Sequence, residues 1–304
     1  MIKRTICIEN PCHLKCRNEQ MVVSYEHIKG YESLPEKTVP IEDIGMVVLE
    51  HQQITLSHYL LDKLVANNAA VIICNETRHP SGLMFSLESH TLQSERFKAQ
   101  IEATEPLKKQ LWQQAVKAKI SNQAAVLHKW NINNTYLKNA AQSVKSGDAD
   151  NNEAKAAAYY WSNLFPAAWQ FFRKREGPPP NNLLNYGYAI LRATVARAIA
   201  GAGLLPTLGI FHRNRYNAYC LADDIMEPYR PFVDIIVRRI IDKTSAVDVL
   251  TKDLKVELLK ITSVDVLLDD ETSPLMVATQ RTATSLARCY TGEQRKLLLP
   301  EIPE

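Results

Sequence analysis

Residues 181–234 read NNLLNYGYAILRATVARAIAGAGLLPTLGIFHRNRYNAYCLADDIMEPYRPFVD. Apolar residues recur at helical spacing over 183–200, 219–226 and 232–241, so this stretch predicts three helices. Glycine and proline interrupt the pattern between 201 and 209 and predict a loop there. The second half of the chain therefore belongs to a helical class.

The helical period extends outward from this stretch but does not reach the start of the chain. Further helices are predicted at 96–100, 106–119, 123–127, 154–165, 254–261 and 274–290, with loops at 146–152 and 173–182. The first quarter instead holds short runs rich in Val and Ile, at 4–9, 20–25, 37–41, 46–49 and 70–74, and one helix that begins near Ser57. We therefore expect an α+β, mainly α chain. A small β-rich N-terminal domain (1–85), which we expect to form a dimer contact, precedes a larger all-helical domain (86–304).

Composition places the chain among average soluble proteins. Of its 304 residues, 46% are hydrophobic and 23% are charged, which argues against disordered and collagen-like classes. The net charge is only +3. However, residues 1–100 hold 10 basic and 12 acidic side chains, whereas residues 101–304 hold 26 and 21. A polyanion should therefore prefer the second half.

The compartment follows from cysteines and apolar runs. The six cysteines are scattered through apolar stretches, a pattern typical of reduced thiols. The opening residues MIKRTICIENPCH lack the apolar run of a signal peptide, and no segment approaches the ~18 apolar residues of a membrane span. We expect a cytoplasmic protein without a membrane partner.

One group of side chains in residues 181–234 is suited to binding a hard metal ion. His212 lies in a basic loop, and Asp223, Asp224 and Glu227 follow on a mostly apolar helix that ends at a proline. Asp224 and Glu227 are three residues apart and share a helix face. The same acids would also suit a solvated helix end paired with Arg230, with a histidine that is only structural. The spacing leaves both interpretations open. Phosphate-binding GxxxxGK[ST] and nucleophile GxSxG motifs are absent from the sequence.

Several segments together resemble one known family, and they span nearly the whole chain. They include IENPCHL (8–14), TVPIEDIGMVVLE (38–50), PPPNNLLNYGYAILRATVAR (178–197) and LGIFHRNRYNAYCLADDIMEPYRPFVD (208–234). The chain resembles the CRISPR-associated (Cas) spacer-acquisition integrase and endonuclease, the catalytic subunit of the adaptation complex. Its length and the NPCHL opening are most similar to the type II versions.

The resemblance implies a catalytic metal site in the helical domain. Its ligands would be Glu153 in NNEAKAAAYYW, His212 in LGIFHRNR and Glu227 in DDIMEPYRP. Asp224 would contact these ligands without binding the metal itself. Two carboxylates and one imidazole suit Mg²⁺ or Mn²⁺ and leave positions open for phosphate oxygens. Without the resemblance, Glu153 would be interpreted as an acid in the first turn of an Ala-rich helix, where the helix dipole favours it.

The resemblance also implies a reaction and partners. A spacer-precursor 3′-OH would attack a phosphodiester at the edge of a CRISPR repeat, in antiviral defence. The substrates would be duplex DNA with 3′ single-stranded ends and repeat DNA. The protein would form homodimers, bridged by a dimer of a small ferredoxin-like Cas partner, and the type II effector nuclease would be a further partner. The alternatives are a noncatalytic DNA-binding scaffold and a small-molecule metallohydrolase.

Basic residues near the predicted ligands are candidates for phosphate contacts. One of them lies close enough to the acids to orient a carboxylate instead of touching DNA. The six candidates are Arg173, Lys174, Arg175, Arg213, Arg215 and that residue, Arg230.

Overall fold

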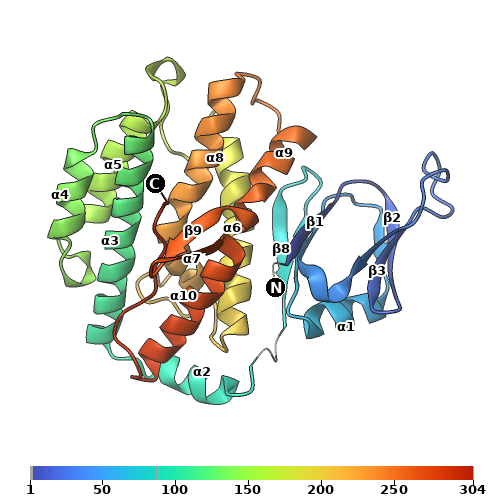
Figure 1. Cartoon of the computed structure of the whole chain (residues 1–304), viewed down its shortest axis with the longest axis horizontal. Helices are drawn as coiled ribbons and strands as arrows, with labels where there is room; N and C mark the ends of the chain where they lie inside the picture. The colour runs from blue at the N-terminus through green and yellow to red at the C-terminus, as the bar shows by residue number, and fades with distance from the viewer. Residues whose placement is uncertain (1–2, 87, 89, 304) are drawn as a thin grey trace. The chain divides into compact units, whose positions relative to one another are not determined.

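The computed structural model describes residues 3–86, 88 and 90–303. The chain divides into two compact units, Met1–Thr91 and Leu92–Glu304. The first unit is built mainly of strands and the second mainly of helices (Figure 1). The expected α+β class with a larger helical second part is therefore confirmed.

The first unit contains two four-stranded sheets. One sheet has the order β1 (Arg4–Ile8), β5 (Ile44–Leu49), β7 (Ala70–Cys74), β8 (Pro80–Met84). Its first three strands are parallel and β8 is antiparallel to β7. The other sheet has the order β4 (Lys37–Pro40), β3 (Gln20–Ser24), β2 (Cys12–Arg17), β6 (Ile54–Leu56). Every residue of β5 is buried, as expected for a central parallel strand with a continuous apolar run.

The helix α1 (His58–Ala66) contributes to the core of this unit. The Ser57 hydroxyl accepts a hydrogen bond from the Leu60 amide at 3.3 Å, so Ser57 caps the helix as its position predicts. Leu60 and Leu64 are fully buried and pack among apolar side chains of both sheets, including Val47.

The second unit is a helical assembly around two long, largely buried helices. They are α3 (Glu105–Lys129) and α6 (Asn181–Gly201). The other helices are α2 (Gln93–Ile101), α4 (Thr135–Ser143), α5 (Asn152–Leu164), α7 (Cys220–Met226), α8 (Arg230–Lys243), α9 (Lys252–Leu259) and α10 (Leu275–Tyr290). Among the described residues, no helix has both the length and the apolarity that a membrane span requires.

The helical unit differs from the prediction in three places. The helices expected at 106–119 and 123–127 are one continuous helix, α3, because Asn122, between them, is buried and donates its side-chain amide to the carbonyl oxygens of Pro228 and Pro300 rather than breaking the helix. Helix α4 was not predicted. The expectation of an all-helical second domain is corrected by an antiparallel hairpin of β9 (Asp265–Leu268) and β10 (Glu271–Pro274). Its turn uses Asp269 and Asp270 with positive φ angles.

The packing of α3 and α6 brings distant segments together. α3 contacts α5 and the 3₁₀ turn η4 (Glu227–Tyr229), and α6 contacts α7 and α8. A Cβ atom at Gly187 of α6 would lie 2.5 Å from Val233 Cγ1 of α8, so the close approach of these two helices requires glycine. The predicted ligand residues 153 and 227 therefore lie at the starts of two elements, α5 and η4, that pack on α3.

Candidate functional site

Glu153 is positioned by the start of α5. Asp148 accepts hydrogen bonds from the backbone amides of Asn152 and Glu153, each at 2.9 Å. These are two of the amides that the first turn of a helix leaves without an intrahelical partner. The predicted loop over 146–152 thus contains the cap that holds Glu153 in the first turn.

Glu227 is positioned at the junction of α7 and α8. Its side chain is 7% exposed, and its Oε1 atom lies 2.9 Å from Arg230 Nε. The Arg230 guanidinium in turn lies over the Tyr188 ring, 4.8 Å from the centroid, which is a favourable cation–π distance. Of the two roles considered for Arg230, the structure shows the contact with a carboxylate.

Lys119 joins the two glutamates. Its Nζ atom lies 2.6 Å from Glu153 Oε1 and 2.6 Å from Glu227 Oε2, with only 11% of its side chain exposed. It donates a hydrogen bond to Glu153. Glu227 Oε2 forms an ion pair with the same ammonium. Two acids distant in sequence therefore meet at one positive charge.

The charges of this cluster stabilise one another. Burial lowers the pKa of Lys119, but Glu227 and Glu153 more than offset it, so the pKa is raised overall. Burial raises the pKa of Glu227, but Arg230 and Lys119 outweigh burial and lower it overall. Both groups are therefore ionised at neutral pH.

His212 is held by Asp224. His212 Nδ1 lies 2.5 Å from Asp224 Oδ1, and the Phe211 amide donates to Asp224 Oδ2 at 2.9 Å. The Asp224 hydrogen bond raises the pKa of His212 although burial opposes it. Because Nδ1 faces Asp224, Nε2 is the nitrogen that remains to bind a ligand. Asp224 thus contacts His212, one of the predicted ligands that it is expected to support.

The same face of α3 supports both halves of the site. Trp112 stacks on Phe211, with ring centroids 4.4 Å apart and planes 2° from parallel, and meets the edge of His212 at 5.7 Å. Lys119 lies seven residues, or about two turns, further along this helix. One helix therefore packs under the histidine loop and pairs with both glutamates.

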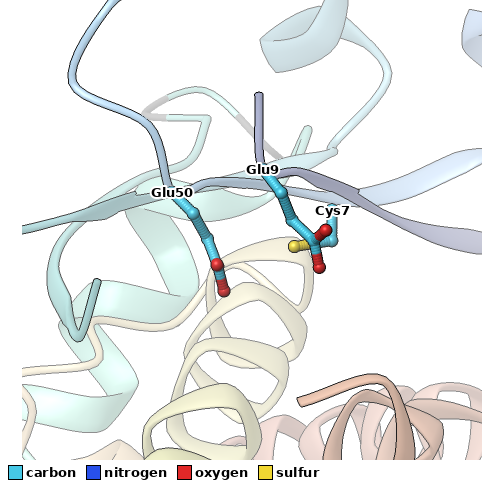
Figure 2. A group of neighbouring side chains, drawn as sticks. All are labelled: Cys7, Glu9 and Glu50. Atoms are coloured by element: carbon cyan, nitrogen blue, oxygen red, sulfur yellow. The ribbon is translucent and has the colours of Figure 1, made fainter. Parts of the chain in front are cut away.

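The three predicted ligands are not drawn into one closed group. Glu153 and Glu227 meet at Lys119, whereas the imidazole of His212 is turned toward Asp224. Among the described residues, only one set of three His, Cys, Asp or Glu side chains has its ligand atoms within 4.8 Å of one another. This set is Cys7, Glu9 and Glu50, in the strand-rich unit (Figure 2). No motif in the sequence indicated this group.

The predicted phosphate-binding residues fall into two groups. Arg173 donates to Asn181 and Asn185, both at 2.9 Å, and is therefore held at the start of α6, while Arg230 pairs with Glu227. The other four are exposed: Lys174, Arg175, Arg213 and Arg215. Arg213 pairs with Glu105 at 2.5 Å, and Arg215 lies over the ring of Tyr216.

The buried carboxylate of Asp234 fixes the tyrosine on which Arg173 and Arg230 lie. Tyr160 and Tyr188 donate hydrogen bonds to Asp234 at 2.9 and 2.5 Å. Burial raises the pKa of Asp234 to about 6, although both tyrosines oppose the shift. The Tyr188 ring carries both Arg230 and Arg173. No pattern in the sequence indicated this cluster.

Sequence reasoning also missed Lys119, although one signal was available. Ala115, Val116 and Ile120 are buried on α3. Lys119 lies four residues after Ala115 and three after Val116, so it shares their helix face. A lysine on the apolar face of a helix requires a buried partner, since burying an unpaired ammonium is costly. The identity of the partners depends on how α3, α5 and η4 pack.

Comparisons with known proteins agree with this architecture. The family model described as CRISPR associated protein Cas1 matches residues 6–253. The CRISPR-associated endonuclease Cas1 of Neisseria meningitidis serogroup C is 33% identical over 305 residues, which cover 99% of this chain and 97% of the relative. Both matches extend through the strand-rich unit into the helical one.

Two solved structures share the fold. A casposase bound to its integration product has a TM-score of 0.76 at 20% identity, covering 98% of this chain and 92% of the casposase. A chain of a Cas6-RT-Cas1–Cas2 complex has a TM-score of 0.73 at 19% identity, covering 99% of this chain and 36% of that one. On the family match and the full-length relative, the chain belongs to the CRISPR-associated Cas1 family.

Proposed function

We propose that the chain is a divalent-metal-dependent DNA integrase and endonuclease of CRISPR adaptation, with Glu153, His212 and Glu227 as its metal ligands. The observation that carries the proposal is the meeting of Glu153 and Glu227 at one positive charge, the Lys119 ammonium. A full-length relative named as an endonuclease and a fold shared with a casposase support the reaction class.

The donors suit Mg²⁺ or Mn²⁺. Oxygens of Glu153 and Glu227 both lie 2.6 Å from one ammonium nitrogen, so the two carboxylates can reach a single cation. Carboxylate oxygens and one imidazole suit these ions, whereas the thiol in the Cys7 group suits softer metals. Glu153, Glu227 and the Nε2 atom of His212 would hold the ion. When bound, it would neutralise charge that develops on the phosphate and lower the pKa of the attacking hydroxyl.

In the proposed reaction the 3′ oxygen of the spacer precursor forms a bond to phosphorus at the repeat edge. The bond from that phosphorus to the 3′ oxygen of the preceding nucleotide in the array strand breaks, and this oxygen takes up a proton while the attacking hydroxyl loses one. The protein's residues hold the site during this exchange: Asp224 fixes the His212 ring, and Arg230 keeps Glu227 ionised. No protein nucleophile is required.

The proposed partners follow the same family. DNA substrates would be duplexes with 3′ single-stranded ends and the CRISPR repeat, contacted by the exposed Lys174, Arg175, Arg213 and Arg215. A homodimer formed through the strand-rich unit would join a small ferredoxin-like Cas partner. A structural relative that is part of a Cas1–Cas2 complex supports this assembly. In a type II system the effector nuclease would join as well.

Strand transfer of a labelled duplex with 3′ overhangs into a repeat-bearing plasmid tests the proposal. With Mn²⁺ or Mg²⁺ and the small Cas partner, the wild-type protein should form joined product, and chelator should abolish it. Glu153→Gln and Glu227→Gln should each lower the rate by at least about 100-fold, because each removes charge at the site of phosphoryl transfer. Glu293→Gln, an exposed acid on the same unit, is the matched control.

The alternative functions give different results in the same experiment. A noncatalytic scaffold would bind the duplex in chelator but form no joined product with any metal. A small-molecule metallohydrolase would show no DNA affinity. Full transfer activity in both glutamine variants would contradict the assigned site.

A further inference from the structure

The Lys119 ammonium pairs with both of the glutamates proposed as metal ligands. Its ammonium lies 2.6 Å from one oxygen of Glu153 and 2.6 Å from one oxygen of Glu227. The Lys119 side chain is 11% exposed and Glu227 is 7% exposed, so solvent screens this contact only weakly. Among the described residues, no other basic side chain lies within ion-pair distance of Glu153.

The two carboxylates need a positive charge to remain together. Both of their nearest oxygens lie within 2.6 Å of one nitrogen, so two negative charges share one small region. Like charges this close repel strongly where water is excluded. Arg230 pairs with Glu227 alone, which leaves Lys119 as the charge that links the two acids.

We propose that Lys119 is an internal counter-ion: it holds Glu153 and Glu227 together without metal and must be displaced for the divalent ion to bind. This inference rests on the proposed metal ligands. The ammonium and the ion compete for the same carboxylate oxygens, so Lys119 lowers the affinity for the metal. Lysine suits this role because its charge is carried on a flexible four-carbon chain that can move away. Lys119 is therefore a positioning residue that also sets the metal concentration at which the site fills.

The test is Mn²⁺ affinity, measured by titration calorimetry on the full chain. Lys119→Met removes the competing charge and leaves two acids in need of a cation, so Mn²⁺ should bind at least about tenfold more tightly than to wild type. In chelator this variant should melt at a lower temperature than wild type, and Mn²⁺ should restore it. A residue that merely shaped the site would weaken binding when removed.

Lys117→Met is the matched control. Lys117 is a half-buried lysine on the same helix, and among the described residues no ion pair joins it to an acid. Its loss removes the same charge from α3 without touching the glutamates. Mn²⁺ affinity should stay within about twofold of wild type, because a separated charge near the surface interacts weakly with the site.

If Lys119→Met does not fold in chelator, a second pair of variants tests the same role. Lys119→Met combined with Glu153→Gln leaves only Glu227, which Arg230 balances, and this double variant should bind Mn²⁺ more tightly than Glu153→Gln alone. Equal or weaker binding by the lysine variants would overturn the counter-ion role while leaving the metal centre in place. Absence of Mn²⁺ binding by both wild type and Lys119→Met would overturn the metal centre and the counter-ion together.

Discussion

Gly209 is the residue that lets the histidine loop approach α7. A Cβ atom there would lie 2.4 Å from the His212 carbonyl oxygen and 2.8 Å from Asp224 Oδ2. Both atoms belong to the pair that orients the imidazole. These distances leave no room for a methyl group, so the geometry of His212 requires glycine at position 209.

Gly209→Ala should therefore destabilise the protein by about 1–3 kcal/mol, the usual cost of forcing extra atoms into a packed site. It should also weaken metal binding, since the His212 loop must move. Gly82→Ala is the control, because its Cβ would make only ordinary contacts of 3.5 Å or more. Thermal denaturation of both variants checks the prediction, and equal melting temperatures would contradict it.

Asp234 gives the protein a specific dependence on pH. Its pKa in the folded state is raised from 3.8 to about 6, chiefly by burial. The folded protein therefore binds more protons than the unfolded chain between these values, and stability falls as pH rises through this window. Asp234→Asn removes that dependence.

From pH 4 to pH 7, the unfolding free energy of wild type should fall relative to Asp234→Asn by up to about 3 kcal/mol. Denaturant unfolding at several pH values measures the difference. A constant difference across the window would contradict the raised pKa of Asp234.

At the scale of elements, the start of α5 determines where Glu153 points. Asp148 caps this helix through two backbone amides, one of them that of Glu153 itself. The cap precedes the helix in a turn where Gly147 adopts a φ of 67°. The position of the proposed ligand thus depends on a residue that would not touch the metal.

Asp148→Ala should cost about 1–2 kcal/mol of stability, as for other helix caps, and should lower Mn²⁺ affinity because Glu153 loses its fixed backbone. Asp150→Ala is the neighbouring control: the Asp150 carboxylate pairs with the exposed Lys145 and accepts neither of the two amide hydrogen bonds at the start of α5. Circular dichroism melts and calorimetry measure both effects. Similar losses in the two variants would show that the cap does not position Glu153.

The elements also show which features can be predicted from sequence. Periodic segments such as 183–200 and 219–226 are found as helices α6 and α7, because their apolar faces are continuous. Strand β2 was missed, since its alternation of buried and exposed residues runs through His13 and Lys15 in a short polar segment. The β9–β10 hairpin was missed because its strands are only four residues long.

The candidate site was predictable only in part, because some of its contacts arise from tertiary packing. Glu153, His212 and Glu227 were named from motifs, and the structure brings the two acids together. Lys119 and Asp234 could not be assigned, because their partners lie on other helices and become neighbours only through packing. Sequence periodicity locates the helices but does not pair their polar residues.

At the scale of the whole molecule, the described residues hold two groups of side chains of the kind that binds metal ions. The helical unit holds Glu153 and Glu227 around Lys119, and the strand-rich unit holds Cys7, Glu9 and Glu50. The proposed function requires that a hard divalent ion choose the helical unit. The excess of basic residues after position 100 agrees with DNA approaching that unit, where a divalent ion would add positive charge.

Anomalous diffraction from crystals of the full chain grown with Mn²⁺ tests this claim most directly, because it locates the ion without relying on activity. If the ion binds in the helical unit, a peak is expected between the carboxylates of Glu153 and Glu227, beside His212, with Lys119 moved away from both acids. A peak at Cys7, Glu9 and Glu50 alone, with Lys119 still paired to both glutamates, would contradict it.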